Sequence, residues 1–136
     1  MSPDGVTVLI ADDDKLVLAT YKYSFERHGY HVLLAENGNA ALAHLEKMSV
    51  DVVFLDILMP QKEGLETLLE MKQRFPEIPV YVMSGGAGRS KQDILAMAKR
   101  FGARDVIRKP VTPQVLITHI EDALRTRPQR GGAKRA

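Results

Sequence analysis

The chain has 136 residues, 45% of them hydrophobic, which suits one domain with a single apolar core. It contains no cysteine, so disulfide bonds and thiolate-bound metals are excluded. The formal net charge is only +2, yet the end of the sequence carries basic side chains and no acidic one: Arg125, Arg127, Arg130, Lys134 and Arg135.

The ends of the sequence show no targeting feature. Residues 1–5 contain no basic region followed by an apolar stretch, and no apolar run approaches the roughly 18 residues that a membrane helix needs. We therefore expect a cytoplasmic protein without membrane insertion. Pro128 and Gly131 argue against a helix near the end, so we expect a folded domain over 1–126 and a basic, disordered tail over 127–136. A nucleic acid is not the expected partner of this tail.

Short apolar runs alternate with stretches of helical periodicity along the chain. Strands are predicted over 6–11, 31–35, 51–56, 79–84 and 104–108. Helices are predicted between and after them, over 16–28, 40–48, 65–75, 94–101 and 113–124. Gly29 and Gly102 are predicted to stop the first and fourth helices, Pro76 follows the third, and Thr112 is a candidate N-cap of the fifth, with Pro113 at its first position. This alternation predicts an α/β domain built of βαβ units around a parallel sheet.

Polar side chains follow four of the predicted strands at the point where each strand ends. The acidic run Asp12-Asp13-Asp14 follows the first strand, Asp56 ends the third, Ser84 ends the fourth and Lys109 follows the fifth. Because the carboxyl ends of neighbouring parallel strands meet at one edge of a sheet, we expect these groups to converge on a small site.

The residue types at this site indicate phosphoryl chemistry. Clustered carboxylates repel one another unless a cation neutralises them, and all-oxygen ligands favour Mg²⁺. The Asp56 carboxylate can attack phosphorus to give an acyl phosphate, with Lys109 and Ser84 binding the phosphoryl oxygens. The glycine-rich run 84–88 lacks the Gly-Lys-Ser/Thr of a nucleotide-binding loop and is interpreted as a turn before a helix.

Taken together, these residues resemble the receiver domain of two-component response regulators over about residues 6–126. The resemblance rests on Asp12-Asp13, on Asp56 with Met59-Pro60, on Ser84 and on Lys109-Pro110. It implies a flavodoxin-like, doubly wound sheet of five parallel strands in the order 2-1-3-4-5, with five helices.

The resemblance also implies a role for each site residue. Asp56 would be phosphorylated by a sensor histidine kinase or a histidine phosphotransfer protein, and Ser84 and Lys109 would bind the phosphoryl group. The implied metal ligands are Asp12, Asp13, Asp56 and the backbone carbonyl of Leu58. The bond between Lys109 and Pro110 is expected to be cis, which proline permits.

Three positions depart from the family pattern. Val106 stands where most relatives have a tyrosine or phenylalanine whose ring turns inward on phosphorylation, so the usual switch residue is absent. Leu58 and Gly86 stand where many relatives carry polar side chains that orient the water that attacks the acyl phosphate.

From this resemblance we expect a stand-alone signalling or phosphorelay protein. It would not be an enzyme, apart from its own autophosphorylation and autodephosphorylation, and it would act by binding an unknown downstream protein or by forming a homodimer. One alternative is a phosphohydrolase of the haloacid dehalogenase type, with Asp12 and Asp14 as its acidic pair, although Lys15-Leu16 replaces that family's Gly-Thr continuation. A second alternative is a degenerate receiver that serves only as a dimerisation module, which Val106 keeps open.

Overall fold

The computed structural model describes residues 5–57, 64–85 and 91–126, with the side chains of all of these except 91–94. Strands and helices alternate through these ranges as predicted. The strands are β1 (Thr7–Ala11), β2 (His31–Ala35), β3 (Val52–Asp56), β4 (Val80–Ser84) and β5 (Asp105–Arg108). The helices are α1 (Lys15–Arg27), α2 (Gly38–Lys47), α3 (Gly64–Arg74), α4 (Lys91–Arg100) and α5 (Pro113–Thr126).

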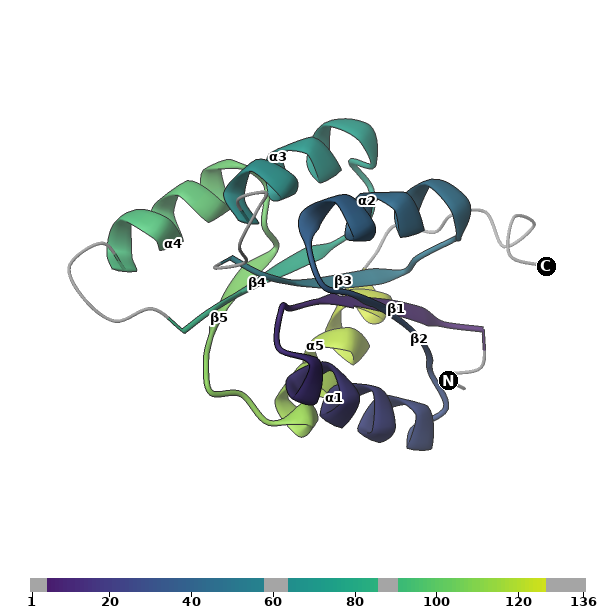
Figure 1. The fold of residues 1–136 in the computed structure, drawn as a ribbon. Helices are drawn as coiled ribbons and strands as arrows, with labels where there is room; N and C mark the ends of the chain where they lie inside the picture. The colour runs from purple at the N-terminus through teal and green to yellow at the C-terminus, as the bar shows by residue number, and fades with distance from the viewer. Residues whose placement is uncertain (1–4, 58–63, 86–90, 127–136) are drawn as a thin grey trace.

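The strands form one parallel sheet in the order β2-β1-β3-β4-β5, which confirms the predicted fold class and strand order. Figure 1 shows α2, α3 and α4 on one face of this sheet and α1 and α5 on the other. Because all pairs are parallel, the carboxyl ends of β1, β3, β4 and β5 lie along the same edge. The polar residues predicted for the site all belong to this edge.

The central strands are apolar on both faces because helices cover both sides of the sheet. Every residue of β3 and β4 is buried. In β4, Val80 and Val82 belong to the apolar cluster that contains residues of α2 and α3, whereas Tyr81 and Met83 belong to the cluster with α1 and α5. Such strands appear in a sequence as continuous apolar runs rather than as an alternating pattern.

Element boundaries differ from the predicted ones by one to three residues. All strands except β2 begin one residue later than predicted, and α4 begins at Lys91 rather than at residue 94. The helix α2 begins at Gly38 because the Asn37 side chain accepts a hydrogen bond from the Ala40 backbone N–H at 2.8 Å, a cap that apolar periodicity does not reveal. The positive φ angles of Gly29 (97°) and Gly102 (107°) confirm the two predicted helix stops.

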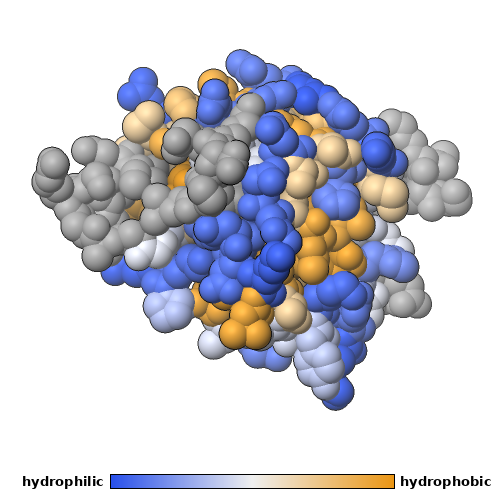
Figure 2. Space-filling view, in the orientation of Figure 1, coloured by the Kyte–Doolittle hydropathy of each residue, from blue (hydrophilic) through white to orange (hydrophobic). Residues whose placement is uncertain are grey.

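The β2 edge of the sheet is partly apolar at the surface. Its central residues Val32, Leu33 and Leu34 are each half-buried, and Figure 2 shows hydrophobic surface between the helices on the two faces. A ring nitrogen of His44, on α2, lies 2.9 Å from the Leu34 carbonyl oxygen. This contact occupies one backbone group of the exposed edge, which limits pairing with another chain.

Two sequence predictions concern parts of the chain that the structure tests only in part. Among the described residues, no helix is long and apolar enough to cross a membrane. The predicted tail over 127–136, and with it the domain boundary at residue 126, lies outside the described residues.

Candidate functional site

Three of the predicted acidic residues come together at the carboxyl ends of β1 and β3. Carboxylate oxygens of Asp12, Asp13 and Asp56 lie within 4.8 Å of one another. Asp12 and Asp56 are buried, whereas Asp13 is exposed. The arrangement follows from the sheet order, because β1 and β3 are adjacent parallel strands that end at the same level.

The consecutive acids after β1 have separate roles. The Asp12 backbone N–H donates to the Ala35 carbonyl at 3.0 Å, and its Oδ1 accepts from the Asp14 N–H at 2.9 Å, which holds the turn after the strand. Asp14 caps α1, since its Oδ1 accepts from the backbone N–H groups of Leu16 (3.0 Å) and Val17 (3.2 Å). The Asp14 carboxylate therefore stabilises a helix, while Asp12 and Asp13 belong to the acidic cluster.

Lys109 supplies the positive charge of the site. Its Nζ donates to Asp12 Oδ2 at 3.0 Å and to Asp56 Oδ2 at 3.2 Å. Burial alone would lower the pKa of this ammonium, but the hydrogen bond to Asp12 and the negative charge of Asp56 outweigh burial, so the pKa is raised. The peptide bond between Lys109 and Pro110 is cis, as predicted.

Ser84 completes the edge at the end of β4. The residue is 4% exposed, and its hydroxyl has no hydrogen-bond partner within the described part of the chain. Its backbone carbonyl accepts from the Lys109 N–H at 2.9 Å, which ties the ends of β4 and β5 together. Burying a hydroxyl without a hydrogen-bond partner costs free energy of folding. At this edge, the Ser84 hydroxyl can donate a hydrogen bond to an oxygen of a bound ligand.

Two glycines lie close to residues of the site, Gly64 against backbone atoms and Gly85 against a side chain. A Cβ added at Gly64, the first residue of α3, would lie 2.4 Å from the Cα and carbonyl oxygen of Ile57, directly after Asp56. The absence of a side chain lets α3 pack against this segment. A Cβ at Gly85 would lie 3.4 Å from Lys109 Cβ, an ordinary contact. No sequence signal shows what approaches a single glycine, so Gly64 was not predictable.

A shallow apolar groove lies beside Lys109, between α1 and the segment that joins β5 to α5. Its volume is about 310 Å³, and it is lined by Leu16, Val17, Thr20, Tyr21, Lys109, Pro110, Val111 and Pro113. Leu16 is 77% exposed although it is a large apolar side chain. Tyr21, which also lines this groove, was not predicted as a site residue, because a tyrosine on the inner face of a helix is indistinguishable from an ordinary core residue.

Val106, at the position where most relatives have an aromatic residue, packs against the apolar core. Val106 is half-buried, pairs with Val82 across β4 and β5, and packs against the apolar cluster on the α3 side of the sheet. Of the other atypical positions, Leu58, with its predicted backbone ligand, and Gly86 lie outside the described residues.

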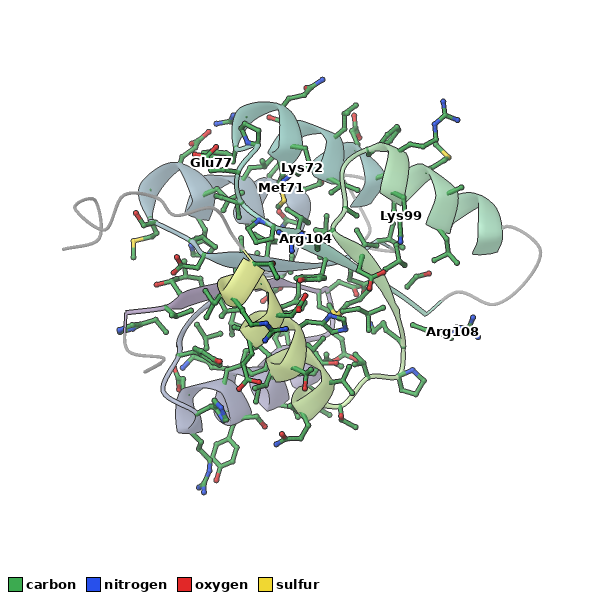
Figure 3. All side chains as sticks on the ribbon, turned by 180° about the vertical axis from the view of Figure 1, so that it is seen from behind. Met71, Lys72, Glu77, Lys99, Arg104 and Arg108 are labelled. Atoms are coloured by element: carbon green, nitrogen blue, oxygen red, sulfur yellow. The ribbon has the colours of Figure 1, made fainter. Side chains whose placement is uncertain are left out.

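Basic residues elsewhere on the molecule are not part of the site. Figure 3 shows Arg104 just before β5, Arg108 at the end of β5 and Lys99 on α4. Lys72 is a partly buried lysine whose Nζ donates to the Ile78 carbonyl at 2.6 Å and the Pro76 carbonyl at 3.0 Å, so it holds the turn between α3 and β4. Only Lys109 places an ammonium at the acidic cluster among the described side chains.

Comparisons with known proteins agree with this geometry. The family model described as a response regulator receiver domain matches residues 8–121. A transcriptional regulatory protein, CpxR of Klebsiella pneumoniae subsp. pneumoniae, is 35% identical over 118 residues, which is 87% of this chain and 49% of that protein. The chain thus spans about half the length of this relative.

Solved structures show the same fold. A CheY-like response regulator receiver domain protein from Methanospirillum hungatei JF-1 superposes with a TM-score of 0.81 at 29% identity, covering 88% of this chain and 94% of that one. A receiver domain from Clostridium thermocellum gives a TM-score of 0.79 at 32% identity, with the same coverage.

Proposed function

The chain belongs to the response regulator receiver family of two-component signalling, and from this premise we propose that Asp56 is its phosphoryl acceptor. The observation that carries the proposal is the convergence at Asp56. This buried carboxylate ends β3, belongs to the acidic cluster and contacts the Lys109 ammonium. Ser84, at the same edge, has a buried hydroxyl with no hydrogen-bond partner among the described residues.

The proposed step is a single displacement at phosphorus. One oxygen of the Asp56 carboxylate forms the new bond to phosphorus while the bond to the donor's imidazole nitrogen breaks, and that nitrogen keeps the electron pair and takes a proton from solvent. The product is an acyl phosphate. The Lys109 ammonium can donate a hydrogen bond to one phosphoryl oxygen, because it already lies at the Asp56 carboxylate. The Ser84 hydroxyl can donate to another phosphoryl oxygen.

The donor set fits Mg²⁺. Three carboxylates within 4.8 Å offer only oxygen ligands, and their mutual repulsion favours a dication. Asp12, Asp13 and Asp56 would hold the ion, with the Leu58 carbonyl as the fourth predicted ligand. When bound, Mg²⁺ supplies charge neutralisation for the phosphoryl oxygens. Hydrogen bonds from the Lys109 ammonium orient the Asp12 and Asp56 carboxylates.

The proposed phosphodonors are a sensor histidine kinase and a histidine phosphotransfer protein. The groove between α1 and the segment after β5 lies beside Lys109 and exposes Leu16, which suits a partner that presents an apolar helix surface next to its phosphohistidine. Output would then come from binding a downstream protein, and the chain would catalyse only its own phosphorylation and dephosphorylation.

Both alternatives lose support in the structure. A phosphohydrolase that pairs Asp12 with Asp14 would need both carboxylates at one site, whereas the Asp14 carboxylate caps α1. The family match and the strand order also favour a receiver. A degenerate receiver would not need the complete acidic cluster with its lysine.

Incubation with acetyl phosphate tests the proposal without a cognate kinase. Wild-type protein should acquire one phosphoryl group in Mg²⁺ and none in EDTA, and Asp56→Asn should acquire none because an amide does not attack phosphorus as a carboxylate does. Asp105→Asn, which changes a carboxylate on β5 away from the site, is the matched control and should behave as wild type. Labelling that survives in Asp56→Asn but is lost in Asp12→Asn would instead support the phosphohydrolase.

A further inference from the structure

A hydrogen bond links α1 to the segment that follows Lys109. The Tyr21 hydroxyl donates to the Val111 carbonyl at 2.9 Å, across 90 positions of sequence. Tyr21 is 4% exposed, and its ring stacks on Phe25 with centroids 6.0 Å apart. The apolar ring is therefore fixed in the core, and only its hydroxyl reaches the surface segment.

Lys109 lies between two points of attachment. At Lys109 itself, the backbone N–H donates to the Ser84 carbonyl at 2.9 Å, which fixes the segment to the end of β4. After it, Val111 is fixed to α1 by Tyr21. Among the described residues, no other hydrogen bond involves the backbone of residues 110 and 111. Pro110 is exposed and Val111 is half-buried.

The Tyr21 hydroxyl is suited to be a permanent donor. Burial raises its pKa, the nearby charges of Asp12 and Asp56 raise it further, and only Lys109 acts in the opposite direction. The hydroxyl thus stays protonated at neutral pH. Tyr21 and Lys109 also line the same groove.

We propose that Tyr21 is a positioning residue, whose hydrogen bond to Val111 holds the Lys109 segment against α1 and thereby sets the ammonium at Asp12 and Asp56. This inference rests on the proposed phosphorylation of Asp56. A ring without the hydroxyl would fill the same core space and keep the stack on Phe25, so the two roles of the residue are separable.

The test compares Tyr21→Phe with two control variants. Tyr81→Phe removes the hydroxyl of an equally buried tyrosine that has no hydrogen-bond partner within the described residues, so it should leave the chemistry unchanged. Ile120→Val removes one methyl group from the core of α5, which lowers the unfolding temperature without touching the site. The three variants and wild type are labelled with acetyl phosphate in Mg²⁺, and thermal unfolding is recorded for each.

We expect slower labelling and weaker binding of beryllofluoride in Tyr21→Phe, and in neither of the two control variants. The initial labelling rate of Tyr21→Phe should fall about threefold to tenfold, the range that one net hydrogen bond corresponds to. In calorimetric titrations its affinity for beryllofluoride, a phosphoryl mimic that Lys109 would contact, should fall by a similar factor. Its affinity for Mg²⁺ should not fall, because the acidic ligands are unchanged and a displaced ammonium competes less for them. A general loss of stability would not separate the two ligands in this way.

Two results would overturn the inference. One is a labelling rate and a beryllofluoride affinity in Tyr21→Phe that equal those of wild type. The other is a fall in the labelling rate of Ile120→Val as large as that of Tyr21→Phe, which would show that reduced stability causes the slower labelling. If wild type itself is not labelled, the proposed function fails, and this outcome is distinct from a failure confined to Tyr21.

Discussion

The ammonium of Lys109 lies 3.2 Å from the carboxylate of Asp56, the predicted phosphoryl acceptor. The same ammonium reaches Asp12 at 3.0 Å, so one cation bridges the ends of β1 and β3 from its place after β5. Asp12 and Asp56 have side chains only 1% and 6% exposed, and charges that are removed from water need a partner.

Loss of this ammonium should destabilise the protein, and Mg²⁺ should compensate. In EDTA, Lys109→Met should lower the free energy of unfolding by about 1–3 kcal/mol, because two buried carboxylates lose a charged donor. Mg²⁺ should raise the stability of this variant more than that of wild type, because no other described side chain places a cation at the acidic cluster. Urea unfolding with and without Mg²⁺ measures both effects. Lys99→Met, which removes an exposed 3.5 Å pair with Asp105, should cost less than about 1 kcal/mol. Equal stability of Lys109→Met and wild type in EDTA would contradict the account.

Gly64→Ala should damage both the fold and the site. Its Cβ would lie 2.4 Å from Ile57 backbone atoms, so either α3 or the segment after Asp56 must move. We expect a loss of about 2–3 kcal/mol in urea unfolding, as for overpacked cores, together with slower labelling by acetyl phosphate. For the stability measurement, Gly85→Ala is the matched control, because its Cβ would make an ordinary 3.4 Å contact. Unchanged stability in Gly64→Ala would show that the close approach does not exist in solution.

Stability should fall as the pH rises above about 10. Burial is the first cause that raises the pKa values of Tyr21, Tyr30 and Tyr81 above their ordinary value of 10.0. Each tyrosine hydroxyl therefore keeps its proton to a higher pH in the folded state than in the unfolded state. The stabilisation is complete below pH 10 and is lost as the pH rises through the pKa values of the folded state. Urea unfolding between pH 8 and 11 measures the slope. Tyr81→Phe should flatten it, by at most ~1.4 kcal/mol per pH unit. A constant free energy across this range would refute the prediction.

Much of the fold follows from sequence pattern because parallel strands covered by helices on both faces must be apolar throughout. The runs that became β3 and β4 are buried at every position, and the sequence places a polar residue at the end of each. That placement, with Lys109 directly after β5, is why Asp56, Ser84 and Lys109 were predictable as one site. The strand order itself came from the family resemblance, since periodicity does not show which strands are neighbours.

The remaining features depend on contacts between distant parts of the chain. The partner of the Tyr21 hydroxyl lies 90 residues away, and the backbone that Gly64 approaches belongs to a different element. The division of roles between Asp12 and Asp14 depends on local geometry, because either residue type can cap a helix or join an acidic cluster. Asn37, by contrast, is a preferred cap residue just before α2 and was overlooked only because apolar periodicity begins later.

Activation should not centre on Val106. Its side chain is short, stiff and packed against the sheet's apolar cluster, so it has no second placement comparable to that of a tyrosine ring. We expect beryllofluoride with Mg²⁺ to change hydrogen exchange chiefly in residues 84–92 and the start of α4, where glycines follow Ser84. Exchange is compared with and without the mimic, and Asp56→Asn is the control that should not respond. Changes centred on 104–108, with none in 84–92, would show that β5 remains the switch.

Asp56 is the proposed carrier of the phosphoryl group, and chemical trapping of the modified residue identifies the carrier. Protein labelled with acetyl phosphate in Mg²⁺ is treated with borohydride, which reduces an aspartyl phosphate to homoserine, and its peptides are sequenced by mass spectrometry. Homoserine is expected at position 56, and aspartate at positions 12 and 13. Homoserine at position 12 or 13, or labelled protein with unmodified Asp56, would contradict this assignment.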